Sequence, residues 1–299
     1  MFRTHLCSHW RWLLFWIGAV LLLPSPAQAT PAAPADTPVV FAADNVEEWA
    51  VGAGLVYWAN NCFADEFNPF AALLRKPAGG GIQRTLEAIE DFARCNTYSS
   101  LLSSADGLYF YDASLSRIAR MPLGEPYTPV TVKELAEAQA PTAGRGLVEA
   151  GDYLYWVHAG GVNALHRVKK DGSSAVETVA NTGASPSDML VVGATVYWTD
   201  SSGVWTISTN CAVLPCAGTQ TQFVAFGANN SGYGLLYQFL GGPQGNYRVY
   251  WVQRIISGAN AAYQIRYRSC NQITVCTLTS PITFYGSTTN WRIGFPLLV

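Results

Sequence analysis

The chain has 299 residues, of which 49% are hydrophobic, 13% aromatic and only 13% charged, and its formal net charge is −2. Soluble globular chains carry about 25% charged residues, and this balance excludes a basic nucleic-acid-binding surface and a strongly acidic disordered tail. The 27 glycines, 16 prolines, 15 tyrosines and 10 tryptophans favour many short strands joined by tight turns.

The first 29 residues have the pattern of an export signal. Arg3 and Arg11 precede an apolar run at residues 12–23, and Ala27-Gln28-Ala29 provides the small-x-small pattern at which a signal peptidase cuts. A helix of that length covers about 18 Å, well short of the ~30 Å apolar layer of a bilayer. We therefore predict a cleaved signal peptide at residues 1–29, no membrane span after cleavage, and a secreted, periplasmic or cell-surface protein. Residues 30–38 are predicted to be a linker, and residues 39–299 the folded domain.

Export changes how the cysteines are interpreted. Removal of the signal peptide leaves six, an even number that favours disulfides in an oxidising compartment. They are Cys62, Cys95, Cys211, Cys216, Cys270 and Cys276. Two close pairs, 211 with 216 and 270 with 276, each follow a strand-like run, and Cys62 would pair with Cys95 by elimination. The competing interpretation is a metal site, but the only histidines left are His158 and His166, and no ligand pair has zinc-type spacing. We expect disulfides, no metal and no cofactor.

One short sequence motif recurs along the chain: a β-branched or leucine residue followed by aromatic residues. The first aromatics of the five copies are 52, 46, 42 and 53 residues apart, and they are Tyr57, Tyr109, Tyr155, Tyr197 and Tyr250. This period fits one four-stranded propeller blade per repeat. The sequence therefore predicts an all-β chain, a β-propeller with five recognisable blades, in which each aromatic doublet packs between neighbouring blades.

Two units divide cleanly into four strands each, and the others do so in part. In the first unit, residues 71–77 are a plausible third strand, whereas Leu86, Ile89, Phe92 and Ala93 would line one face of a short helix over residues 85–94. Residues 133–140 are similarly prone to form a helix, and both segments are predicted to be loop decorations. The predicted strands of the clear units are residues 147–149, 154–157, 164–168 and 176–179, and residues 188–192, 196–199, 204–207 and 222–226.

Both ends of the predicted domain carry strand-like segments. Residues 39–42 resemble a fourth strand, which would belong to the last blade, and residues 291–299 resemble the first strand of a sixth blade. We expect a six-bladed propeller that is incomplete at its C-terminus. The alternative is a five-bladed ring closed by the two terminal strands.

The four residues Tyr197-Trp198-Thr199-Asp200 match the Tyr-Trp-Thr-Asp signature of the propellers in low-density-lipoprotein-receptor-like proteins. The blade plan also resembles bacterial six-bladed, TolB-like propellers and a secreted propeller class of the same plan. The resemblance covers residues 39–299 and implies the propeller fold. Function does not follow from it, because propellers carry out binding, scaffolding and catalysis alike.

A ring of polar residues is the candidate site. Each stands three places after the first aromatic of its repeat, and they are Asn60, Asp112, His158, Asp200 and Gln253. One interpretation is a rim that binds a polar ligand; the other is that each side chain caps a local turn through backbone N–H groups. Catalytic motifs such as Gly-x-Ser-x-Gly and His-Glu-x-x-His are absent from the sequence.

Two functions remain open. The first is a binding or scaffold module for a protein or glycan partner, with no nucleic acid bound and no chemistry assigned. The alternative is a propeller hydrolase or lyase with a channel-bound metal or an acid–base pair. Exposed aromatic side chains on one rim favour binding, whereas acidic or histidine side chains converging from several blades favour catalysis.

Overall fold

A computed structural model describes residues 46–60, 71–89, 98–142, 146–160, 162–183, 186–210, 220–228, 230–241, 245–257, 260–270 and 282–287. The chain divides into two units, residues 1–40 and residues 41–299, and every described element lies in the second unit. The predicted signal peptide and linker lie outside the described residues. So do the expected strands at residues 39–42 and 291–299, which leaves the sixth blade a prediction.

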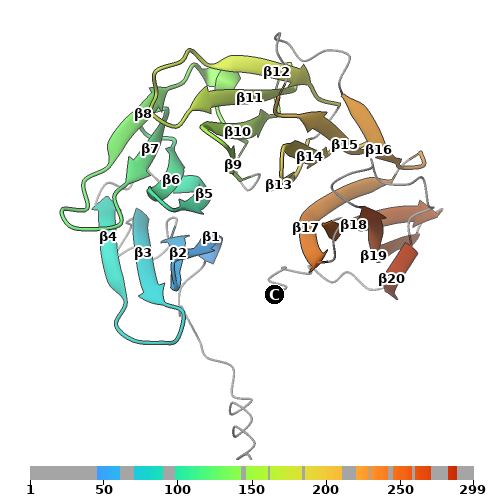
Figure 1. Ribbon diagram of the computed structural model, residues 1–299, viewed down its shortest axis with the longest axis horizontal. Coiled ribbons are helices and arrows are strands. Elements are labelled where there is room, and N and C mark those ends of the chain that lie inside the picture. The colour runs from blue at the N-terminus through green and yellow to red at the C-terminus, as the bar shows by residue number, and fades with distance from the viewer. Residues whose placement is uncertain are drawn as a thin grey trace, which may run out of the picture. The chain divides into compact units, whose positions relative to one another are not determined.

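Five four-stranded antiparallel sheets follow one another along the chain, and the strands of each sheet are paired in chain order (Figure 1). The first sheet contains β1 (Val46–Gly52), β2 (Leu55–Asn60), β3 (Ala71–Pro77) and β4 (Arg84–Ile89). The second contains β5 (Tyr98–Ser104), β6 (Gly107–Asp112), β7 (Arg117–Met121) and β8 (Val130–Glu134). The third contains β9 (Val148–Ala150), β10 (Tyr153–His158), β11 (Ala164–Lys169) and β12 (Glu177–Asn181). The fourth contains β13 (Met189–Val192), β14 (Thr195–Thr199), β15 (Gly203–Ser208) and β16 (Thr221–Ala225). The fifth contains β17 (Ser231–Gly241), β18 (Asn246–Ser257), β19 (Asn260–Cys270) and β20 (Ile282–Ser287).

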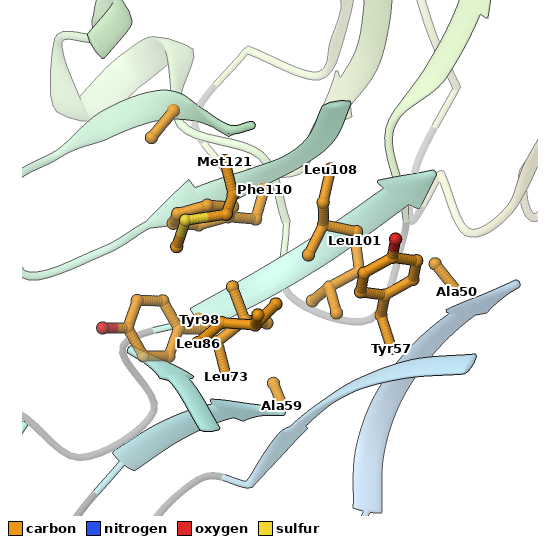
Figure 2. Close-up of a cluster of buried hydrophobic side chains, with 11 residues drawn as sticks. Ala50, Tyr57, Ala59, Leu73, Leu86, Tyr98, Leu101, Leu108, Phe110 and Met121 are labelled. Atoms are coloured by element: carbon orange, nitrogen blue, oxygen red, sulfur yellow. The ribbon is translucent and has the colours of Figure 1, made fainter. Parts of the chain in front are cut away.

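The aromatic doublets connect consecutive sheets, because the two members of each doublet point to opposite faces of the second strand. The first aromatic contributes to the core shared with the following sheet, as Tyr57 does between the first and second sheets. The second aromatic contributes to the core shared with the preceding sheet, and Phe110 enters the same cluster from the other side (Figure 2). Tyr109 and Trp156, Tyr155 and Trp198, and Tyr197 and Trp251 repeat this pairing in the next three cores.

This arrangement confirms the predicted fold: the chain is a β-propeller built from four-stranded blades, with the doublets sealing each blade against the next. Trp156, Trp198 and Trp251 are each 0% exposed. A buried aromatic side chain removes about 150–250 Å² from water, so these contacts dominate the cores between sheets. The strands predicted for the third and fourth units are all present.

The helix predicted over residues 85–94 is wrong where the structure describes it, because residues 84–89 form β4. The reason is a β-bulge: β3 residues Leu73 and Leu74 face Glu87 and Thr85, which leaves Leu86 as an extra residue between them. An extra residue shifts the two-residue alternation of a strand, so the apolar positions imitate helical spacing. The helical tendency predicted for residues 133–140 is also mostly wrong. Lys133 belongs to β8, and only a 3-10 turn, η2 (Glu137–Gln139), follows that strand.

The same bulge occurs in the fourth strand of all five sheets, always opposite the middle of the third strand. The extra residues are Leu86, Val132, Val179, Phe223 and Phe284. Leu86, Val179 and Phe223 are buried in the cores between sheets, 9%, 1% and 7% exposed. In the first, third and fourth sheets the bulge therefore turns one apolar side chain of the outermost strand into the core.

In two places a carboxylate of one sheet accepts hydrogen bonds from backbone N–H groups of the next sheet, at a bulge in the first strand of that next sheet. Asp188, directly before β13, accepts a hydrogen bond at 2.7 Å from the backbone N–H of Leu235 in β17. The register of β17 shifts there, and Gly234 has φ of 66°, a left-handed conformation that glycine adopts without strain. Glu48 of β1 likewise accepts from the N–H groups of Ser100 and Leu101, at the register shift of β5.

Candidate functional site

The structure places the five predicted site residues one per sheet, on or directly after the second strand. Asn60, Asp112 and His158 end their strands, Asp200 follows β14 directly, and Gln253 lies four residues before the end of β18. The side chain of Asn60 is not among those described. No hydrogen bond or ring contact joins any two of the other four, so within the described residues the ring is a set of separate positions.

Asp112 is 2% exposed and caps the turn between β6 and β7. Its Oδ1 accepts from the N–H of Ser114 at 3.1 Å, the Ser114 hydroxyl at 2.7 Å and the N–H of Leu115 at 3.3 Å. Its Oδ2 accepts from Nε of Arg117 at 3.1 Å, forming an ion pair. These bonds supply the local turn-capping role that Asp side chains commonly perform.

Asp200, 1% exposed, performs the same role between β14 and β15 and also bonds the segment that enters its sheet. Its Oδ1 accepts from the N–H groups of Ser202 at 2.7 Å and Gly203 at 3.0 Å. Its Oδ2 accepts from the N–H of Gly183 at 3.0 Å. A Cβ at position 183 would lie 2.4 Å from that oxygen, so a glycine is required for this approach.

His158 lies between two backbone carbonyls, with Nδ1 2.7 Å from the oxygen of Ala140 and Nε2 3.0 Å from that of Gly160. A neutral imidazole has one N–H and can donate to one of these oxygens, whereas the protonated ring can donate to both. Ala140 belongs to the segment that enters the third sheet, as Gly183 does for the fourth.

The structure brings His166 next to His158, with 6.4 Å between the ring centroids. His166 is 5% exposed, and its Nε2 has no hydrogen-bond partner among the described residues. Burial is the main cause, and the neighbouring His158 a second one, of a pKa of His166 that is lowered to about 4. Sequence reasoning missed this pair, although β10 and β11 form a hairpin in which Trp156 faces His166, so that His158 is its diagonal neighbour.

Gln253 is 3% exposed, and its Oε1 accepts from Nη1 of Arg266 at 2.7 Å. This bond links β18 to β19 within the fifth sheet. Gln253 therefore differs from the two aspartates, which cap turns. Because β18 continues past residue 253, no turn follows Gln253, and its side chain instead accepts a hydrogen bond from an arginine on the neighbouring strand.

A second carboxyl group, Glu87 of β4, lies close enough to Asp112 for their charges to interact. Burial raises the pKa of Glu87, and the charge of Asp112 raises it further, while Tyr98 and Arg117 have the opposite effect. Its Oε2 is buried without a hydrogen-bond partner among the described residues. Sequence reasoning missed Glu87 because the residue fell in the predicted helix.

The described residues contain no group of three or more His, Cys, Asp or Glu side chains that could hold a metal ion. Cys270 is the one predicted disulfide cysteine that the described ranges include; it ends β19 and is 6% exposed. The other five lie outside them, so the pairing stays a prediction. None of the described helices is long and apolar enough to cross a membrane.

An apolar patch is exposed on the first strand of the fifth sheet. Tyr237, Phe239 and Leu240 of β17 are 41%, 58% and 44% exposed. The strands β17, β18 and β19 have 11, 12 and 11 residues, whereas the first strand of the fourth sheet, β13, has four. The fourth sheet is thus too short to cover the whole of β17, and we call these three residues the β17 patch.

The fifth sheet also differs in charge. Residues 201–299 contain five arginines and no lysine, aspartate or glutamate, whereas residues 30–200 contain eleven basic and twenty acidic side chains. Four of these arginines, at positions 248, 254, 266 and 268, lie on β18 and β19. This division is visible in the sequence, but the net charge of the whole chain conceals it.

No family model and no curated protein matches the chain. Among solved structures, it resembles a Mycobacterium tuberculosis puromycin-hydrolyzing peptidase with a TM-score of 0.52 and 13% identity, over 80% of this chain and 38% of that one. It also matches a puromycin hydrolase (0.44, 13% identity, 69% of this chain and 32% of that one) and PorZ of Porphyromonas gingivalis (0.43, 10% identity, 79% and 42%). The chain thus spans less than half the length of each. The likeness to the peptidase, at 13% identity, shows a propeller fold and nothing of function.

Proposed function

We propose that this chain is an exported β-propeller that acts as a binding or scaffold module for a protein or glycan partner. The observation that carries the proposal is the β17 patch, because monomeric proteins rarely leave adjacent large apolar side chains in water unless the surface binds something. Two of its three members are aromatic, and aromatic residues are enriched in protein interfaces.

We further propose that the propeller belongs with secreted bacterial six-bladed, TolB-like propellers. The Tyr-Trp-Thr-Asp motif at residues 197–200 and the blade plan support this, as does the signal pattern at residues 1–29, followed by a linker at 30–38 and the propeller domain at 39–299. Export is tested by the mass of the protein recovered outside the cytoplasm: it should begin at Thr30. A chain that keeps Met1 and stays in the cytoplasm contradicts the proposal.

The binding role is tested by changing the β17 patch and measuring binding to a glycan array and to purified envelope proteins. Phe239→Ser should abolish the binding that the wild type shows. The matched control is Leu115→Ser, which removes an apolar side chain of similar exposure, 50%, from the turn between β6 and β7. Equal binding by both variants would show that the patch is not the contact surface.

The alternative, a propeller hydrolase or lyase, is favoured by the pair of Glu87 and Asp112. One carboxyl with a raised pKa beside one held by an arginine is the arrangement that acid–base pairs use. A broad hydrolase panel combined with metal analysis of the exported protein tests it. Turnover that Glu87→Gln eliminates, with the fold intact, would establish catalysis in place of the binding role.

A further inference from the structure

One backbone N–H group recurs in the first-strand segments of the second to fifth sheets, and in three of them it donates to a carboxylate. It belongs to the residue directly before the one that pairs with the first aromatic of the doublet; these residues are Leu101, Leu147, Met189 and Leu235. Glu48 accepts from Leu101 at 3.3 Å. Asp188 accepts from its neighbour Met189 at 2.8 Å and from Leu235 at 2.7 Å. We call these four N–H groups the first-strand amides.

The first-strand amide of the third sheet is the exception. Leu147 is 3% exposed. No described residue accepts a hydrogen bond from its N–H group or from that of Gly146 before it. The great majority of buried backbone N–H groups in folded proteins have a partner. An orphaned amide at a position that elsewhere holds a carboxylate therefore points to a ligand.

The difference arises from the residue that the preceding sheet contributes. The carboxylates that reach the second and fifth sheets, Glu48 and Asp188, each stand one residue before the corresponding position of their own sheet. The second sheet has Ser100 at that place, one residue before Leu101. Ser100 is 0% exposed, and its Oγ is buried without a hydrogen-bond partner among the described residues. The second and third sheets thus hold a hydroxyl and an amide, both buried and unpartnered, at positions that correspond to bonded pairs elsewhere.

The backbone at Gly146 has the form and the space that an anion needs. Its φ is 71°, and a Cβ added there would meet no atom within 4 Å. Successive N–H groups beside a left-handed residue form a concave arrangement that binds anions. The second sheet shows this arrangement in use: Ser100 has φ of 58°, and its N–H and that of Leu101 both donate to Glu48.

We propose that the N–H groups of Gly146 and Leu147, together with the Ser100 hydroxyl, bind a small carboxylate ligand of the size of formate or acetate. The ligand is a carboxylate because the chain's own carboxylates bond the corresponding amides of the other sheets. It is small because Ser100 and Leu147 are buried, which leaves no path for a polymer. This site goes beyond the proposed function and uses no residue of the β17 patch.

Labelling the protein with isotope-labelled leucine tests the site and its controls together, because three of the four first-strand amides belong to leucines. In nuclear magnetic resonance spectra, sodium acetate should shift the amide signal of Leu147 in a saturable way. The signals of Leu101 and Leu235 should stay in place, because Glu48 and Asp188 already hold these amides. Sodium chloride at equal ionic strength should move none of them.

Variants of Ser100 test the third donor. Ser100→Ala should weaken acetate binding at least about tenfold, the loss expected for one hydrogen bond to a charged group. Ser99→Ala, which alters a buried serine on the same strand, is the control and should leave the affinity unchanged. Ser100→Asp places a carboxylate where the first and fourth sheets have one, and aspartate tolerates the left-handed conformation. This variant should abolish the acetate shift and raise the urea midpoint at neutral pH.

Each of the remaining outcomes overturns the inference. An unchanged Leu147 signal means that water satisfies this amide, and an equal shift with chloride means a site for anions in general. Equal acetate affinity in Ser100→Ala and the wild type removes the hydroxyl from the site. A shift produced by poly-L-glutamate means that the site accepts an acidic polypeptide in place of a small ligand. If acetate leaves Leu147 unchanged while Phe239→Ser abolishes partner binding, this inference fails and the proposed function stands.

Discussion

The buried histidine gives the sharpest test of the structure, through the dependence of stability on pH. The pKa of His166 is about 4 in the folded protein and 6.5 in an unfolded chain. Between these values the unfolded state binds more protons, so the contribution to stability is complete above pH 6.5 and is lost as the pH falls toward 4. Applied to this pair of pKa values, linkage predicts a loss of about 2 kcal/mol between pH 7.5 and pH 5.0.

The perturbation is His166→Leu, which removes the titration while keeping an apolar side chain against Trp156. Urea unfolding followed by tryptophan fluorescence at both pH values gives the free energy of unfolding of each protein. The wild type should lose about 2 kcal/mol more than the variant, because the other titrating groups are common to both. His158→Gln is the control and should keep most of the loss. Parallel changes in wild type and His166→Leu would refute the buried, neutral state of this ring.

Three further predictions concern buried contacts and hydrogen bonds and are measured by urea unfolding at pH 7.5. Trp198→Ala should lower the free energy of unfolding by about 3–5 kcal/mol, because the side chain is 0% exposed. Trp49→Ala is the control and should cost less than about 1 kcal/mol, because Trp49 is 43% exposed. Equal costs would contradict the doublet packing. Gly183→Ala should cost about 1–3 kcal/mol, because its Cβ meets Asp200, and Gly124→Ala, with open space around it, should be nearly neutral. Asp188→Ala leaves the N–H of Leu235 unpaired and should cost about 1–3 kcal/mol; a neutral result would show that water replaces the carboxylate.

The sequence was sufficient to predict the doublets, since Tyr197 and Trp198 lie on successive positions of one strand and must face opposite cores. It was insufficient at β4, where the bulge at Leu86 disturbs the alternation on which strand prediction depends. The turn-capping bonds of Asp112 and Asp200 follow from local chemistry, and local turn capping was one of the two interpretations left open.

Contacts between elements could not be derived in the same way. The pairing of His158 with His166 requires the register of β10 and β11, and the approach of Glu87 to Asp112 requires the packing of two sheets. The absence of acidic residues after Asp200 can be found by counting along the sequence alone. Its meaning, however, depends on the face of the sheet to which each arginine points.

The repeated bulge has a consequence for behaviour in concentrated solution. The fourth strand lies at the edge of every sheet, with backbone groups available for pairing with a strand of another molecule. An inserted residue interrupts the regular spacing of those groups and twists the strand, so that a foreign strand cannot continue the ladder along its length. The bulge therefore also protects the edge of each blade against self-association, and it recurs at Leu86, Val132, Val179, Phe223 and Phe284.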